Sequence, residues 1–215
     1  MKYRIKFSKT GQGKYISHLD LLRCFVRAIS RANKDSRFPV KYSEGFNPHP
    51  SITFLLPLSI GITSVCELVD IEFKVDLPRE EIKDRFNEHL PPDLRVLEVT
   101  FPVSKAKDII SARYDVTIED TRGIDADAIL NFLSQEEFSV SKKSKRGEKI
   151  VNLMEYIERF EFLARTGNLV IISFMLSAGG ENNIKPSLVI DEVQKACADG
   201  EFESIETERK EIYFR

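Results

Sequence analysis

Cysteine is scarce in this sequence, and the three cysteines, Cys24, Cys66 and Cys197, lie far apart. No Cys-x-x-Cys pair is present, which argues against a zinc ribbon or an iron–sulfur cluster held by this chain alone. An odd, scattered set provides no disulfide framework either. We therefore expect reduced, buried thiols, because a free cysteine packs as a small apolar side chain.

Long apolar runs are also missing. No stretch reaches the roughly 18 residues that a membrane-spanning helix requires, and the first nine residues (MKYRIKFSK) lack the apolar core of a secretory signal. The P-loop spacing is absent, and no cofactor is expected. Hydrophobic residues make up 42% of the chain and charged residues 31%, which is typical of a folded globular protein. These features predict a cytoplasmic protein that makes no membrane contact.

The formal net charge of −2 hides an uneven distribution along the 215 residues. Residues 1–50 hold 11 Lys and Arg against three acidic residues, which gives them a net charge of +8. Residues 51–215 hold 21 basic and 31 acidic residues, a net charge of −10. A basic block on an otherwise acidic chain indicates an anionic partner for the amino-terminal region.

Hydrophobic periodicity predicts the order β-α-β-β-α-β in the first half. Residues 2–8 alternate apolar and polar side chains, as in a strand with one buried face. Ser17 is a candidate N-cap with Asp20 as its partner acid, and an apolar stripe follows at helical spacing: Leu19, Leu22, Phe25, Val26 and Ile29. The remaining elements are predicted as strands at 52–58 and 67–75, a helix after Pro78 and a strand at 94–101.

The second half repeats this pattern. Strands are predicted at 114–118, 160–165, 169–176 and 205–214, and helices at 125–133 and 187–198. The fold class predicted from the sequence is α+β, with two tandem ferredoxin-like (βαββαβ) domains at residues 1–103 and 110–215.

Several segments resemble one known family. The runs FSKTGQGKYISHLDLLRCFVRA, YSEGFNPHPSITFLLPLSIG and LPPDLRV are similar to the radical SAM-linked protein family, a domain of unknown function. The later blocks KRGEKIVNLMEYIERFE and AGGENNIKPSLVIDEVQKA resemble it as well, so the resemblance covers nearly the whole chain.

The resemblance implies a domain found alone or fused behind a radical SAM protein, often beside RNA-processing and ribosomal-protein genes. This chain has no Cys-x3-Cys-x2-Cys, so the radical SAM protein is expected as a partner in trans. The tandem layout is also similar, at the level of the fold alone, to the CRISPR repeat-processing endonucleases of the RAMP superfamily.

The first candidate RNA-binding residues surround the predicted first helix. A glycine turn, Gly-Gln-Gly, precedes Lys14, and the helix N-terminus at Ser17 offers free N–H groups to a phosphate. Arg23, Arg27 and Arg31 form a charged row that fits a phosphate backbone, although such faces are often merely solvated. An ordinary glycine turn is the alternative for the first feature.

The second candidate is the loop at residues 42–50. Tyr42 and Phe46 offer stacking faces, Asn47 and His49 offer hydrogen bonds, and two prolines stiffen the chain. Such a loop suits a flipped or unpaired nucleotide. The alternative is a structural loop whose Phe46 packs into the core. The loop and the glycine turn are expected to form one positively charged pocket.

The third candidate is an insertion in the second half with a run of basic residues, which either extends the RNA-binding surface or is a solvated hairpin: Lys142, Lys143, Lys145 and Arg146.

These features favour an accessory RNA-binding domain that presents tRNA or rRNA to a radical SAM partner. One alternative is a metal-independent ribonuclease in which His18 and His49 act as general acid and base. Another is a docking module that binds only a protein partner. A metal site formed by His18, Asp20 and Glu67 is disfavoured, because nothing in their spacing singles it out.

Overall fold

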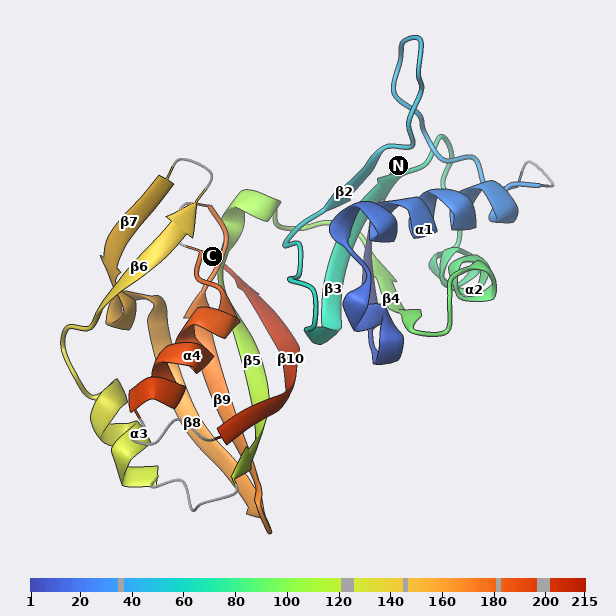
Figure 1. The fold of residues 1–215 in the computed structure, drawn as a ribbon. Coiled ribbons are helices and arrows are strands. Elements are labelled where there is room, and N and C mark those ends of the chain that lie inside the picture. The colour runs from blue at the N-terminus through green and yellow to red at the C-terminus, as the bar shows by residue number, and fades with distance from the viewer. Residues whose placement is uncertain (35–36, 121–125, 145–146, 181–182, 197–201) are drawn as a thin grey trace. The chain divides into compact units, whose positions relative to one another are not determined.

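The structure is a computed structural model that describes residues 1–34, 37–120, 126–144, 147–180, 183–196 and 202–215. The chain divides into two compact units, Met1–Asp108 and Ile109–Arg215. Each unit combines helices with an antiparallel arrangement of strands (Figure 1), so the predicted α+β class is confirmed. None of the helices within the described ranges is long and apolar enough to cross a membrane.

The first unit contains the elements β1 (Lys2–Lys9), η1 (Gly11–Tyr15), α1 (His18–Ala32), β2 (Ile52–Phe54), β3 (Thr63–Glu72), α2 (Arg79–His89), β4 (Leu94–Thr100) and η2 (Ala106–Asp108). Strand β1 lies between β4 and β3, and β2 pairs with the other edge of β3; all these pairs are antiparallel. The strand predicted at 67–75 starts earlier and ends at Glu72, and the one predicted at 52–58 stops at Phe54.

The core of the first unit lies between this sheet and helices α1 and α2. Tyr3, Ile5 and Phe7 are fully buried, as the alternation in β1 predicts. The predicted helix stripe is partly wrong, because Leu19 is 63% exposed and Leu21 is buried in its place. The buried residues of α1 lie on one face of the helix: Leu21, Phe25, Ala28, Ile29 and Ala32. Leu19 precedes Leu21 by two positions, a rotation of about 200° around the helix axis, and therefore points to solvent.

The second unit contains β5 (Ile109–Asp120), α3 (Ala126–Leu133), β6 (Ser139–Ser144), β7 (Gly147–Asn152), η3 (Leu153–Tyr156), β8 (Ile157–Thr166), β9 (Leu169–Ser177), α4 (Pro186–Ala196) and β10 (Phe202–Phe214). Its main strands run in the order β10-β5-β9-β8, and β6 and β7 form a separate hairpin. Alternate side chains of β5 and β9 are buried, and Figure 1 shows α4 lying across one face of the second unit's sheet.

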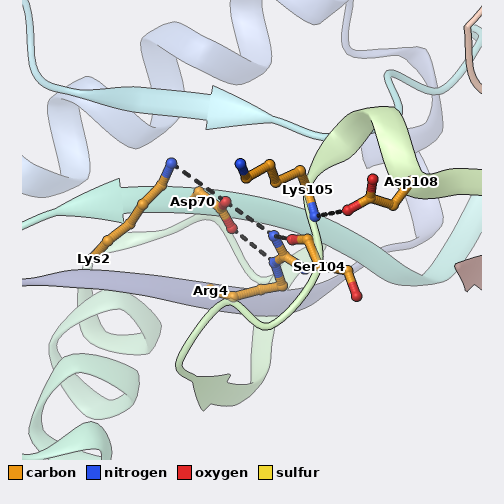
Figure 2. A network of polar contacts seen from close by, with 6 residues as sticks. All are labelled: Lys2, Arg4, Asp70, Ser104, Lys105 and Asp108. Carbon is orange, nitrogen blue, oxygen red and sulfur yellow. Dashed lines mark hydrogen bonds and ion pairs between the residues drawn. The ribbon is translucent and has the colours of Figure 1, made fainter. Parts of the chain in front are cut away.

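A buried ion pair joins β1 to β3 in the first unit (Figure 2). The Arg4 guanidinium donates through Nε to Asp70 Oδ1 at 2.8 Å and through Nη2 to Asp70 Oδ2 at 3.0 Å. The same Nη2 donates to the Ser104 carbonyl at 2.6 Å, and Lys2 Nζ lies 3.7 Å from Asp70. Arg4 therefore connects two central strands and the segment that follows β4.

Removing the Arg4 side of this pair is predicted to destabilise the protein strongly. Arg4→Met leaves the Asp70 carboxylate buried with only the partly exposed Lys2 beside it, and such a loss costs about 3 kcal/mol of unfolding free energy. Lys2→Met is the control and should cost less than about 1 kcal/mol, because Lys2 is exposed. Urea unfolding measures both, and equal losses would contradict the assignment.

Candidate nucleic-acid interface

The glycine turn before α1 is closed by a carboxylate of the protein itself. The Gly13 N–H donates to Asp93 Oδ2 at 3.2 Å, and the Thr10 N–H donates to the Asp93 carbonyl at 2.9 Å. Gly11 has a φ of +50°, and a Cβ built there would lie 2.7 Å from Asp93 Oδ1. Asp93 thus occupies the side of the turn where a phosphate was predicted, and its negative charge opposes a second anion there.

The other polar groups of the turn also have partners inside the protein. Lys9, which is almost fully buried, donates through Nζ to the Ile16 carbonyl at 3.1 Å and more weakly to the Lys14 carbonyl at 3.4 Å. The Lys14 ammonium lies 5.3 Å from the centroid of the Tyr15 ring. This geometry favours the alternative reading, in which the glycines allow close packing against Asp93.

The start of α1 also carries a carboxylate. Ser17 is the N-cap, as predicted, because its Oγ accepts the Asp20 N–H at 3.2 Å. Asp20 Oδ2 accepts the Ser17 hydroxyl at 2.7 Å, and Oδ1 accepts from Arg23 Nη1 at 2.8 Å. The hydrogen bonds from Ser17 and Arg23 hold the pKa of the Asp20 carboxyl below its ordinary value. An anionic ligand at this helix end would meet Asp20 first.

The arginine row lies on the solvent face of α1. Arg23, Arg27 and Arg31 are all exposed. Arg23 pairs with Asp20, and Arg31 donates to the His89 carbonyl at the end of α2. No carboxylate lies within ion-pair distance of Arg27 among the residues that the structure describes. Of the predicted phosphate contacts, Arg27 is therefore the guanidinium most available to a ligand.

The loop predicted to bind a nucleotide forms a projecting arm, which we define as Lys41–Ser51. At its base, the Lys41 N–H donates to the Glu72 carbonyl at 2.7 Å, and the Ser51 N–H donates to the Lys41 carbonyl at 2.8 Å. Nearer the tip, the Ser43 N–H donates to the His49 carbonyl at 2.8 Å, and the His49 N–H donates to Ser43 Oγ at 3.0 Å. Figure 1 shows the arm standing away from the sheet of the first unit.

The tip of the arm holds an aromatic ring in solvent. Phe46 is fully exposed, so the reading in which it packs into the core is wrong. Gly45, with a φ of +121°, reverses the chain just before it. Tyr42, Asn47 and His49 are exposed as well.

The arm and the glycine turn do not form one pocket. The glycine turn follows Lys9, the last residue of β1, which pairs with Ser64 of β3. The arm is hydrogen-bonded to Glu72 of β3, which pairs with Lys2 at the start of β1. These points lie at opposite ends of β1, about 23 Å apart at the rise of an extended strand. The expected convergence of Lys14 with the loop residues is therefore wrong.

The two candidate catalytic histidines are also separated. His18 lies edge-on against the Phe54 ring, with centroids 5.4 Å apart, whereas His49 lies in the arm beyond Ser51. Five residue steps of extended chain, about 16 Å at most, separate position 49 from position 54, and no contact in the described part of the chain brings the two imidazoles together. Within the described ranges, no group of three His, Cys, Asp or Glu side chains is arranged to hold a metal ion.

The lysine-rich insertion belongs to the second unit, in the β6–β7 hairpin. The Lys142 ammonium lies 4.6 Å from the centroid of the Tyr156 ring. Lys145, Arg146 and the side chain of Lys143 lie outside the part of the chain that is described. Sequence reasoning missed a cavity of about 410 Å³ between β6 and the start of α4, lined among others by Lys142, Lys185 and Asp191.

The chain belongs to the family described as an uncharacterized protein conserved in bacteria (DUF2344), which matches residues 2–186. No curated protein matches the sequence. A link to a radical SAM partner stays a prediction.

Three solved structures are similar to this chain, and two of them are H/ACA complexes. A chain of a Cbf5–Nop10–Gar1 complex aligns with a TM-score of 0.55 at 11% identity, covering 98% of this chain and 48% of that one. An archaeal box H/ACA sRNP Nop10–Cbf5 complex gives 0.50 at 12% identity, with 96% and 46% covered. An H/ACA RNP bound to a substrate RNA containing 2′-deoxyuridine gives 0.52 at 10%, with 97% and 47% covered.

The chain thus spans about half the length of the chains it matches, and the likeness at this identity concerns the fold alone. These findings support a similarity to H/ACA complexes in place of the expected likeness to RAMP-superfamily endonucleases.

The Ser17–Asp20 contact predicts a measurable pKa. In an NMR titration, the Asp20 carboxyl should titrate below the ordinary Asp value, and Ser17→Ala should raise that pKa because it removes the main cause of the shift. A depressed pKa in the folded state stabilises the protein above the ordinary value, and this contribution disappears as the pH falls through the folded-state pKa. The stability difference between wild type and Ser17→Ala should therefore shrink in acid.

Ser30→Ala is the matched control on the same helix, because the Ser30 hydroxyl donates to the Val26 carbonyl and does not contact Asp20. An Asp20 pKa that is unchanged in Ser17→Ala, or shifted equally in Ser30→Ala, would refute the assignment.

Proposed function

We propose that the protein binds RNA through its first unit and acts as an accessory domain for a radical SAM partner in tRNA or rRNA modification or processing. The main support for this proposal is the charge on the solvent face of α1. That face has three exposed guanidinium groups, those of Arg23, Arg27 and Arg31, and one carboxylate, that of Asp20. Lys34 continues the row just beyond the helix and is exposed. Planar guanidinium groups fit the oxygens of a phosphate backbone.

The distribution of charge between the two units supports this choice of surface. Residues 1–108 hold 18 Lys and Arg against 14 acidic residues, whereas residues 109–215 hold 14 against 20. The first unit is therefore net +4 and the second net −6. An RNA is attracted to the first and repelled by the second, so the acidic unit is the better place for contact with a protein partner.

The ion pair between Arg23 and Asp20 does not argue against RNA binding. Both side chains are more than half exposed, and an exposed pair contributes little stability because water and salt screen it. Arg23 can exchange the Asp20 carboxylate for a phosphate oxygen at small cost. The contact of Arg31 with the His89 carbonyl is to a neutral group and leaves its charge uncompensated.

We infer further that both units are ferredoxin-like. In the first unit the strand order β4-β1-β3-β2 places the last, first, third and second strands side by side. In the second, β10-β5-β9-β8 has the same order once the β6–β7 hairpin is treated as an insertion. The element order β-α-β-β-α-β then describes each unit. The H/ACA structures support an RNA-related role only through the likeness of the fold.

RNA binding should depend on salt and on Arg27. Fluorescence anisotropy with bulk tRNA should show affinity falling as KCl rises, with a slope set by the number of phosphates contacted. Arg27→Gln should weaken binding and reduce that slope by about 1. The matched control is Arg159→Gln on β8 of the acidic unit, which makes the same charge change at an exposed arginine and should leave binding unchanged. Binding that is absent at low salt, insensitive to salt, or equally weakened by both variants would reject the proposal.

We expect no RNA cleavage by a two-histidine mechanism, because His18 contacts Phe54 whereas His49 is bonded within the arm. Purified protein incubated with bulk tRNA in EDTA should leave the tRNA intact on a denaturing gel. Cleavage that disappears in both His18→Ala and His49→Ala would restore the ribonuclease reading.

A further inference from the structure

Hydrogen bonds hold the chain of the arm on either side of the Phe46 tip. Two hydrogen bonds join Ser43 to His49 just below the tip, and further backbone bonds attach the base to β3. Pro48 and Pro50 each fix one backbone angle. Part of the entropic cost of ordering a binding loop is therefore already met in the unbound protein.

The surroundings of Phe46 favour a nucleobase over a protein as its partner. Most of the neighbouring exposed residues of the arm are polar, namely Ser43, Glu44, Asn47 and His49, while Tyr42 and Pro48 are exposed as well. A protein-binding patch buries contiguous apolar surface at its centre, whereas an aromatic face bordered by hydrogen-bonding groups suits one flat heteroaromatic ring. Asn47, directly after Phe46, supplies an amide that can bond to the edge of a base.

The position of the arm relates it to the cationic helix face. The C-cap residue of α1, Asn33, accepts the Phe38 N–H through Oδ1 at 3.0 Å, so the segment leading into the arm is attached to the end of this helix. Lys34, just past the end of α1, and Lys41, at the base of the arm, are both exposed, although Lys41 also contacts Glu72 at 3.2 Å. Positive charge is thus present at the end of α1 and at the base of the arm, and both attract a phosphate backbone.

We propose that the arm recognises an unpaired nucleotide, with Phe46 stacking on its base, so that the RNA ligand is one with a bulge, loop or single-stranded segment. This inference rests on the RNA binding proposed above and specifies its substrate class. A perfect duplex offers no free base face to Phe46 and is held by phosphate contacts alone.

The test uses three RNA duplexes that differ at one position: fully paired, with a single bulged nucleotide, and with an abasic residue in that bulge. Wild type should bind the bulged duplex about tenfold more tightly than either of the others, the range that stacking of one base supplies. Phe46→Ala should bind all three alike, and Phe46→Tyr should keep the preference. Arg27→Gln should weaken all three and leave their ratios unchanged.

The outcomes separate this inference from the proposed function. No binding to any of the three duplexes at low salt overturns both. Binding of all three with equal affinity by wild type, or a preference that survives in Phe46→Ala, overturns the role of the arm and leaves RNA binding by α1 standing. Because Phe46 is fully exposed, its variants should melt like wild type. Sedimentation of wild type but not Phe46→Ala with anionic liposomes would identify the arm as a membrane anchor and overturn the inference.

Discussion

The antiparallel pairing of β1 with β3, held by the buried Arg4–Asp70 ion pair, determines where everything else in the first unit lies. The register places Tyr3, Ile5 and Phe7 on the face that packs against the helices, and a slip of one residue would turn these rings to the other face. Arg4 and Asp70 lie on that other face with little exposure, where each satisfies the other's charge and hydrogen-bonding groups. The Arg4–Asp70 ion pair therefore helps to fix the register of β1 on β3 as well as stabilising the fold.

The same pairing separates the two segments that looked most suited to bind a ligand. At one end of β1, Asp93 accepts the Gly13 N–H and Lys9 donates to the Ile16 carbonyl, so these backbone groups of the glycine turn are bonded within the protein. At the other end, the arm is hydrogen-bonded at its base and below its tip, and the Phe46 ring is exposed to solvent. The glycine turn is therefore bonded within the protein. The side chains that remain available to a ligand lie in the arm, where two prolines restrict the backbone.

Local sequence patterns predicted much of the fold. The features that those patterns did not predict depend on contacts between residues far apart in the sequence. The alternation in residues 2–8 and the Ser17 cap act over a few residues and were read correctly. Asp93 lies 80 residues from Gly13, so no local signal distinguishes a phosphate-binding turn from one filled by a distant carboxylate. Leu19 and Leu21 are both leucines in the first turn of the helix and differ only in the direction in which they point. Which of them is buried depends on how the helix packs against the sheet. The exposure of Phe46 could not be predicted either, since an aromatic residue in a proline-rich loop is equally compatible with a core anchor.

If the protein binds RNA as proposed, the cations of α1 and the arm have different roles in recognition. Contacts from α1 to phosphates are weakened by salt and are indifferent to sequence, so they supply affinity and direct an RNA to the basic unit. Stacking on Phe46 depends little on salt and requires a base that is free to leave its helix, so it supplies selectivity. Neither feature can replace the other: without the cations the isolated ring has too little surface to hold an RNA, and without the ring the helix face cannot tell a bulge from a duplex. The proposed combination of phosphate contacts from α1 with stacking on Phe46 would therefore suit one unpaired nucleotide in a largely paired RNA.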